Sequence, residues 1–263
     1  MPQSSISDHR IVSRDAWLQE RKALLAQEKE MTRLRDALSE KRRALPWVRV
    51  DKEYSFDTPD GKKTLSDLFD GRSQLIVKHF MMAPGQMDGC VGCSFEVDHV
   101  EAALQHIENH DVKFVSVARA PLPEIEAFKK RMGWRFDWVS SCGSDFNYDF
   151  DVSFTPEQIQ QGNARYNYQE TAVPLEDLSG FSIFYKNDDG EIFHTYSTFG
   201  RGAEEVLGSY MLLDLTPKGR NENGPNFNLT DWVRHHDRYD SDGHVAATGR
   251  WVAAQNTDCC PSG

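Results

Sequence analysis

Residues 74–107 read Q-L-I-V-K-H-F-M-M-A-P-G-Q-M-D-G-C-V-G-C-S-F-E-V-D-H-V-E-A-A-L-Q-H-I. The first nine are mostly apolar, which predicts a strand buried on both faces of a sheet. A loop rich in glycine, proline and methionine follows, and apolar side chains then recur near helical spacing. Cys90 and Cys93 therefore stand where a buried strand passes through a loop into a helix.

This position gives the two thiols different environments. The start of a helix has unpaired backbone N–H groups and a partial positive charge, and both stabilise a thiolate. We expect Cys90 to lie exposed at or just before the first turn, and Cys93 to lie shielded one turn further in. The pattern favours a redox-active pair, with Cys90 as the attacking thiolate and Cys93 as the resolving thiol. Metal ligation and unreactive packing cysteines are the alternatives.

The regions that follow alternate between strand and helix signals. Apolar runs predict strands at 113–118 and 135–141, and a helix with proline in its first turn lies between them at 121–132. Residues 145–150 alternate polar and aromatic side chains, which favours a strand with one solvent-facing side; a polar rim over a pocket is the alternative. Residues 181–198 alternate around an Asp-Gly turn and predict a hairpin. The chain is therefore expected to be an α/β protein with a mixed sheet flanked by helices.

The N-terminal region predicts one long helix over residues 15–45. Ser13 can cap its start, and Pro46 ends it. Ten basic and seven acidic residues interleave in residues 1–45, which argues against a nucleic-acid-binding arm. An apolar stripe is expected to dock on the body or on a second copy of the chain, giving a homodimer. The stripe consists of Trp17, Leu24, Met31, Leu38 and Leu45.

The composition limits the partners and the compartment. The 263 residues are 39% hydrophobic and 27% charged, which is ordinary for a globular protein and excludes disordered and fibrous classes. A net charge of −11 repels phosphate backbones and anionic lipid, so we expect no nucleic-acid or membrane partner. No apolar run approaches the ~20 residues of a spanning helix. A cytoplasmic location is expected, where five cysteines indicate redox chemistry or metal binding rather than a disulfide framework.

The chain divides into an N-terminal helical extension at 1–45, a domain at 46–235 and an extended polar tail at 236–263. Imidazole and thiolate groups near the C-terminus suit zinc or copper, although their spacing matches no closed zinc module. A mobile terminus without a metal is the alternative. The groups are His235, His236, His244, Cys259 and Cys260, and Cys142 is a further isolated thiol.

Two histidines are candidates for supporting the cysteine pair. On the second hairpin strand, alternation places His194, Tyr196 and Thr198 on one face and Ser197 on the other. If that face looks toward the cysteines, His194 can donate a proton or bind a soft metal. His79, on the strand that leads to the pair, is the second candidate. A hydrogen-bonded strand histidine without a catalytic role is the alternative at both positions.

The sequence resembles a thioredoxin-like family catalogued as domain of unknown function 899, whose members are predicted dithiol–disulfide oxidoreductases. The matching stretches lie within residues 10–240 and include H-F-M-M-A-P, G-C-V-G-C-S-F, V-S-V-A-R-A-P-L, E-A-F-K-K-R-M-G-W and W-V-R-H-H-D-R-Y. The resemblance implies a thioredoxin-like sheet with Cys90 and Cys93 at its active edge.

One position departs from the wider thioredoxin pattern. Redox-active thioredoxins have a cis-proline beside the cysteine pair, where it orients disulfide substrates. Gly180 falls near that place, and Pro174 lies six residues earlier. Without the proline, substrate docking by backbone pairing loses support and the thiolates are more open to a metal.

Three functions are therefore weighed. The first is a thiol–disulfide oxidoreductase that uses Cys90 and Cys93 on a thiol or disulfide substrate or a small redox partner, with no firm cofactor. The alternative is a copper- or zinc-binding protein that uses the same cysteines with His79 and His194. The third is a redox-silent scaffold that dimerises through the helix at 15–45.

Overall fold

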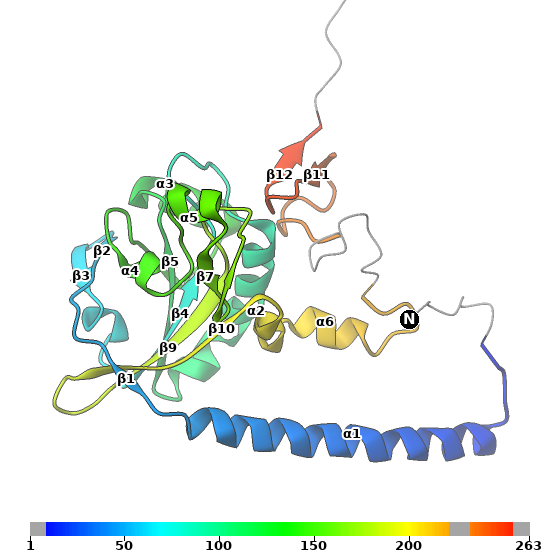
Figure 1. The fold of residues 1–263 in the computed structure, drawn as a ribbon. Coiled ribbons are helices and arrows are strands. Elements are labelled where there is room, and N and C mark those ends of the chain that lie inside the picture. Colours follow the sequence, from blue (N-terminus) through cyan, green and yellow to red (C-terminus); the bar gives the residue numbers. More distant parts are fainter. Residues whose placement is uncertain (1–8, 221–231, 255–263) are drawn as a thin grey trace, which may run out of the picture.

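A computed structural model describes residues 9–220 and 232–254 of the chain (Figure 1). Eight strands form the central sheet: β1 (Val48–Arg49), β2 (Ser55–Thr58), β3 (Gly61–Thr64), β4 (Gln74–His79), β5 (Val112–Ala118), β6 (Asp137–Ser140), β9 (Gly180–Lys186) and β10 (Ile192–Phe199). Their spatial order is β1-β10-β9-β4-β5-β6-β2-β3. The two small hairpins are β7 (Ala164–Tyr166) with β8 (Gln169–Thr171), and β11 (Gly243–Val245) with β12 (Trp251–Ala253).

The helices are α1 (Arg14–Arg43), α2 (Val91–Glu108), α3 (Leu122–Met132), α4 (Phe146–Asp149), α5 (Pro156–Gln161) and α6 (Gly208–Leu213), with 3-10 turns η2 (Asp67–Phe69) and η3 (Gly200–Val206). Strands β4, β5 and β6 are parallel and are joined by α2 and α3, whereas β9 pairs antiparallel with both β4 and β10. A β-α-β unit beside an antiparallel hairpin is the thioredoxin-like arrangement. The expected α/β fold with a mixed sheet flanked by helices is therefore confirmed.

The sheet has a core on each face, which explains why β4 is apolar along most of its length. One core joins β4 and β5 to α2 and α3 through side chains that include Phe80, Phe114 and Phe128. The other contains Leu75 and Val77 of β4 with residues of β2, η2 and α4. Successive side chains of a strand point to opposite faces, so β4 contributes to both cores.

The predicted N-terminal helix is present as α1, and it runs beside the domain in Figure 1. The Ser13 hydroxyl accepts a hydrogen bond from the Ala16 amide at 3.3 Å, as expected for a cap. No residue of α1 is buried, and Leu24 is 50% exposed. Arg35 and Arg42 pair with Glu205 at 3.0 and 3.4 Å. The apolar stripe therefore does not dock on the described body, and dimerisation through it stays a prediction.

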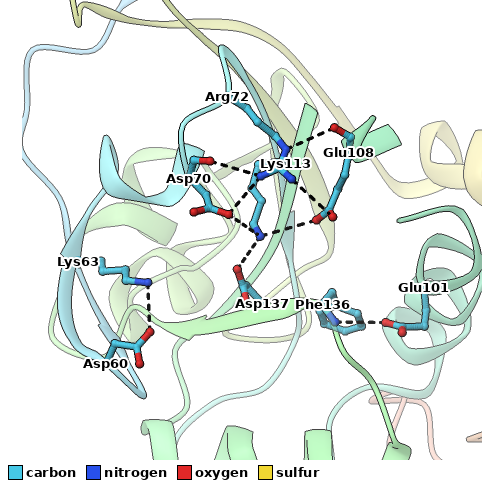
Figure 2. A network of polar contacts seen from close by, with 9 residues as sticks. All are labelled: Asp60, Lys63, Asp70, Arg72, Glu101, Glu108, Lys113, Phe136 and Asp137. Carbon is cyan, nitrogen blue, oxygen red and sulfur yellow. Dashed lines mark hydrogen bonds and ion pairs between the residues drawn. The ribbon is translucent and has the colours of Figure 1, made fainter. Parts of the chain in front are cut away.

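Figure 2 shows a charged network at the end of the sheet where β5 and β6 begin. The Lys113 amine lies 2.8 Å from the Asp137 carboxylate, 3.4 Å from Asp70 and 3.7 Å from Glu108. The cysteines instead follow the end of β4. Because β4, β5 and β6 are parallel, this network lies at the end of the sheet opposite the cysteines. Its ion pairs connect the first residues of β5 and β6 with the segments that precede β4 and β5, and it is not part of the candidate site.

Two local predictions are wrong. Residues 145–150 contain the short helix α4 rather than a strand. Helical spacing brings Phe146 and Phe150 together, with ring centroids 4.7 Å apart, where a strand would direct alternate residues outward. The strand β10 has a bulge between His194 and Tyr196, and His194 Nε2 consequently lies 2.7 Å from Ser197 Oγ. The expected placement of these two side chains on opposite faces fails because a bulge shifts the alternation.

The described part of the expected C-terminal tail is folded rather than extended. Strands β11 and β12 pair antiparallel, and Trp251 is only 9% exposed. Trp251 packs with Val91 and Phe95 of α2 and with Val233. Trp251 thereby attaches the segment to the domain. Cys259 and Cys260 lie outside the described residues.

Among the described residues, no helix has both the length and the apolar character needed to cross a bilayer.

Candidate active site

The loop after β4 places Cys90 at the N-cap of α2, as the sequence predicted. The Cys90 amide donates to the Met81 carbonyl at 3.0 Å, and the Cys90 carbonyl accepts from the Ser94 amide at 3.0 Å. Gly89 has no room for a side chain, because a Cβ there would lie 2.9 Å from Cε1 of Phe128 and closer still to the Phe80 ring. The position of the first cysteine is therefore fixed by backbone bonds on one side and by the aromatic core on the other.

The two thiols have shifted pKa values in opposite directions. A hydrogen bond from the Cys93 side chain lowers the pKa of Cys90 to about 7, although burial opposes it; the amides of Cys93 and Gly92 also contribute to the lowering. Burial raises the pKa of Cys93 well above its usual value, and the neighbouring Cys90 raises it further. At neutral pH the arrangement favours a thiolate on Cys90 and a thiol on Cys93.

Cys93 is 1% exposed, as expected for a shielded thiol, but Cys90 is only 8% exposed. The expectation of an exposed Cys90 is wrong because the turn between β11 and β12 lies on it. The Gly249 carbonyl accepts a hydrogen bond from the Val91 amide at 2.8 Å, which uses one of the donors at the start of α2. Cys90 retains access to a pocket of about 400 Å³, lined also by Met81, Leu175 and Thr248 among others.

A buried ion pair beneath Cys93 was missed by the sequence analysis. The Lys78 amine contacts the Glu96 carboxylate, and it lies 2.5 Å from the Ser179 hydroxyl. Burial lowers the pKa of Lys78, but its electrostatic interactions with Cys93 and with the Glu96 carboxylate outweigh burial, so the pKa is raised. Two signals were present: a lysine inside an apolar strand, and a glutamate three positions after Cys93 on the same helix face.

His79 and His194 lie on the face of the sheet opposite the cysteines. Lys78 points toward Cys93, so the next side chain, His79, points away, and its ring packs on Phe146 and Phe150 of the other core. Hydrogen bonds link the two histidines through Ser182 and Ser197, at 2.8, 2.9 and 2.7 Å. Both are hydrogen-bonded strand histidines, which was the alternative at each position.

Two candidates remain, Tyr196 and Gly180. The guanidinium of Arg42 lies over the ring of Tyr196, with its central carbon 5.8 Å from the ring centroid. Gly180 pairs with His79 across β4 and β9, and a Cβ there would lie 2.6 Å from the Phe199 ring. The close approach of this ring accounts for a glycine at this position.

The proposed metal ligands do not come together. Within residues 9–220 and 232–254, no three His, Cys, Asp or Glu side chains are grouped so that they can hold a metal ion. Since His79 and His194 lie across the sheet, Cys90 and Cys93 have no histidine partner from that set. His235 is buried, and its ring lies 3.0 Å from the Gly89 carbonyl and 2.9 Å from Arg131. Cys142 is an exposed free thiol.

Among solved structures, the chain is similar to a cysteine-to-serine mutant of PrxQ from Xylella fastidiosa, with 18% identity, a TM-score of 0.38, and coverage of 60% of this chain and 88% of that chain. It is also similar to peroxidoxin BcpB from Mycobacterium tuberculosis, with 12% identity, a TM-score of 0.42, and coverage of 63% and 95%. No curated protein matches the chain. A family model matches residues 6–239. The chain therefore belongs to the family described as bacterial protein of unknown function (DUF899).

Proposed function

We propose that the protein is a thiol–disulfide oxidoreductase in which Cys90 and Cys93 cycle between a dithiol and a disulfide. The observation that carries the proposal is the contrast between two thiols one helical turn apart. The pKa of Cys90 is lowered to about 7, whereas that of Cys93 is raised. A thiolate attacks disulfides and a thiol does not, so the first attack belongs to Cys90.

The reaction follows from this order of reactivity. The Cys90 thiolate attacks one sulfur of a substrate disulfide, the substrate S–S bond breaks, and one substrate thiolate leaves. Cys93 then loses its proton, which is taken up by the released substrate thiolate or by water, and attacks Sγ of Cys90; this releases the second substrate thiolate and leaves a Cys90–Cys93 disulfide. Two electrons pass from the protein to the substrate, and a dithiol reductant restores the starting state.

Lys78 supports the second step. Its charge lowers the pKa of Cys93 in part, against the larger effect of burial. In the first step Cys90 forms a bond to a substrate sulfur. The Cys90 sulfur is then part of a mixed disulfide and no longer carries a negative charge. The raising influence of Cys90 on Cys93 ends at that moment, so Cys93 becomes easier to deprotonate when it is needed.

The proposal includes a thiol or disulfide substrate or a small redox partner, and a cytoplasmic location, where thiols are kept reduced. The copper- or zinc-binding alternative has no comparable support, since the histidines expected to complete the ligand set lie on the other face of the sheet.

A redox titration tests the proposal. In glutathione buffers of increasing oxidation, the wild-type protein should form one intramolecular disulfide between Cys90 and Cys93, detected by thiol counting and peptide mass spectrometry. Cys90→Ser should abolish reaction with a disulfide, and Cys93→Ser should accumulate the mixed disulfide on Cys90. Cys142→Ser, which changes an exposed free thiol outside the C-V-G-C motif, is the matched control. The proposal is overturned if the pair stays reduced in every buffer and Cys90 titrates near its ordinary ~8.5.

A further inference from the structure

The turn of the C-terminal hairpin lies directly on the attacking thiol. Gly249 has φ +76°, and a Cβ at this position would lie 2.9 Å from Sγ of Cys90. The turn is tight, because the Ala246 amide donates to the Arg250 carbonyl at 2.8 Å and the Gly249 amide donates to the Ala246 carbonyl at 2.9 Å. The carbonyl of Gly249 is bonded to the amide of Val91. A backbone segment of the chain itself therefore occupies the surface beside Cys90.

This segment is attached at two places. Trp251 is packed against Val91 and Phe95 at the start of α2, with the guanidinium of Arg234 5.4 Å from its ring centroid. Upstream, the buried ring of His235 contacts the carbonyl of Gly89, the residue before Cys90. Both attachments are to the residues that flank the thiol in the sequence, so the hairpin is held where it covers Cys90.

The remaining access to Cys90 is through the pocket of about 400 Å³. Thr248 and Arg250 of the hairpin turn form one side of it, and Pro84 and Leu175 belong to its other walls. Pockets of roughly 300–1,000 Å³ hold small molecules. A disulfide in a folded protein must bring two backbone segments to the attacking sulfur, and the hairpin already lies on that surface.

We infer that the β11–β12 hairpin restricts Cys90 to small-molecule disulfides and excludes disulfides carried by proteins. The inference rests on the proposed function and specifies its substrate class. Cys90 and Cys93 supply the two electrons by the steps given above, and the hairpin decides which disulfide reaches Cys90.

Single-turnover rates of the reduced full-length protein with two probes test this. The probes are bis(2-hydroxyethyl) disulfide and insulin, and each rate is divided by the rate of the same probe with dithiothreitol. The normalised rate should be at least about tenfold higher for the small disulfide, since insulin reacts only from the open form of the hairpin. Trp251→Ala should raise the insulin rate at least about tenfold, because removing a buried tryptophan increases the open population, and should leave the small-disulfide rate nearly unchanged.

Three further variants separate the hairpin from general loss of stability. Gly249→Ala leaves the Trp251 cluster intact but places a Cβ against Sγ of Cys90, and it should also favour insulin. Gly190→Ala has a similar positive φ in an open turn and should change neither rate. Val252→Ala, at a 41% exposed position beside Trp251, is the control for strand β12. Hydrogen exchange of residues 243–253 reports whether the hairpin has been released.

Equal normalised rates for the two probes in the wild-type protein overturn the inference and leave the proposed function standing. An unchanged ratio in variants whose hairpin exchanges freely also overturns it. If Cys90 reacts with neither probe in any variant, the proposed function fails, and the inference fails with it.

Discussion

The Cys93 side chain hydrogen bonds to the sulfur of Cys90, and this contact is the largest influence on the pKa of Cys90, which is lowered to about 7. The same closeness contributes to the raised pKa of Cys93. The reactivity of the first thiol therefore depends on the presence of the second, even before any disulfide forms.

Replacing Cys93 should make Cys90 less reactive at neutral pH. In Cys93→Ala the hydrogen bond is lost, so the pKa of Cys90 should rise and the thiolate fraction that sets its alkylation rate at pH 7 should fall roughly fivefold for the first unit of rise. Iodoacetamide alkylation measured from pH 5 to 10 gives the pKa directly. Cys93→Ser retains a donor and should stay closer to the wild type. An unchanged titration in Cys93→Ala contradicts the assigned role of this hydrogen bond.

The Lys78–Glu96 pair should affect the stability of the fold and the resolution of the mixed disulfide in separate ways. Lys78→Met leaves a buried carboxylate without its partner and should lower the free energy of unfolding by about 3–5 kcal/mol in urea titrations. In the double variant Lys78→Met/Glu96→Met, most of that stability should return, because both charges are gone.

Resolution of the mixed disulfide should be slower than in the wild type in both Lys78→Met and the double variant, since the positive charge of Lys78 that favours the Cys93 thiolate is absent. Quenched-flow mass spectrometry measures the lifetime of the mixed disulfide. Recovery of stability together with wild-type resolution would limit Lys78 to a structural role.

His79 should make the protein less stable in acid. Burial lowers the pKa of His79 to about 3, with smaller effects from Lys78 and His194. Below pH 6.5 the unfolded chain binds a proton at this ring that the folded chain does not, so stability falls as the pH decreases, by up to about 1.4 kcal/mol per pH unit. Urea unfolding at pH 7.5 and 5.0 should show a smaller loss for His79→Asn than for the wild type. His110→Asn, at an exposed histidine, should retain the full loss.

Metal analysis tests the alternative function. Protein purified without oxygen should carry no stoichiometric copper or zinc at the pair, because Cys90 and Cys93 are two ligands without a third from His79 or His194. Mass spectrometry under native conditions and elemental analysis measure the content. One equivalent of either metal that disappears in Cys90→Ser, and persists in His236→Asn, would instead favour the metal-binding function.

The apolar stripe of α1 is expected to pair with that of a second copy, since a repeat every seven residues is typical of helices that pack along their length. Sedimentation of the wild-type protein should show a dimer. Leu24→Glu, within the stripe, should shift it to a monomer, and Ala26→Glu, outside the stripe, should not. A wild-type monomer at micromolar concentration rules out this association.

The order of the central elements could be predicted because each element has a recognisable pattern in its own stretch of sequence. The apolar run of β4, the helical spacing after Cys93 and the Asp-Gly turn each specify an element from neighbouring residues alone. The position of Cys90 at a helix start followed from the same patterns. The placement of His194 did not, because the bulge in β10 leaves no mark in the alternation of polar and apolar residues.

The rest of the site depends on residues far apart in the chain. The burial of Lys78 is acceptable only because Glu96 and Ser179 meet it from other elements. The cover on Cys90 depends on Trp251, which packs in one cluster with Val91, 160 residues earlier, so nothing in the neighbouring sequence indicates the contact. Both features required the tertiary arrangement.

The family model ends at residue 239, whereas Gly249, whose backbone lies against the sulfur of Cys90, comes after that point. The region that matches the family model thus contains both cysteines, but not the turn that lies on Cys90. Membership of the family therefore does not identify the substrate class that we infer, because the residues that support this inference come after the matched region.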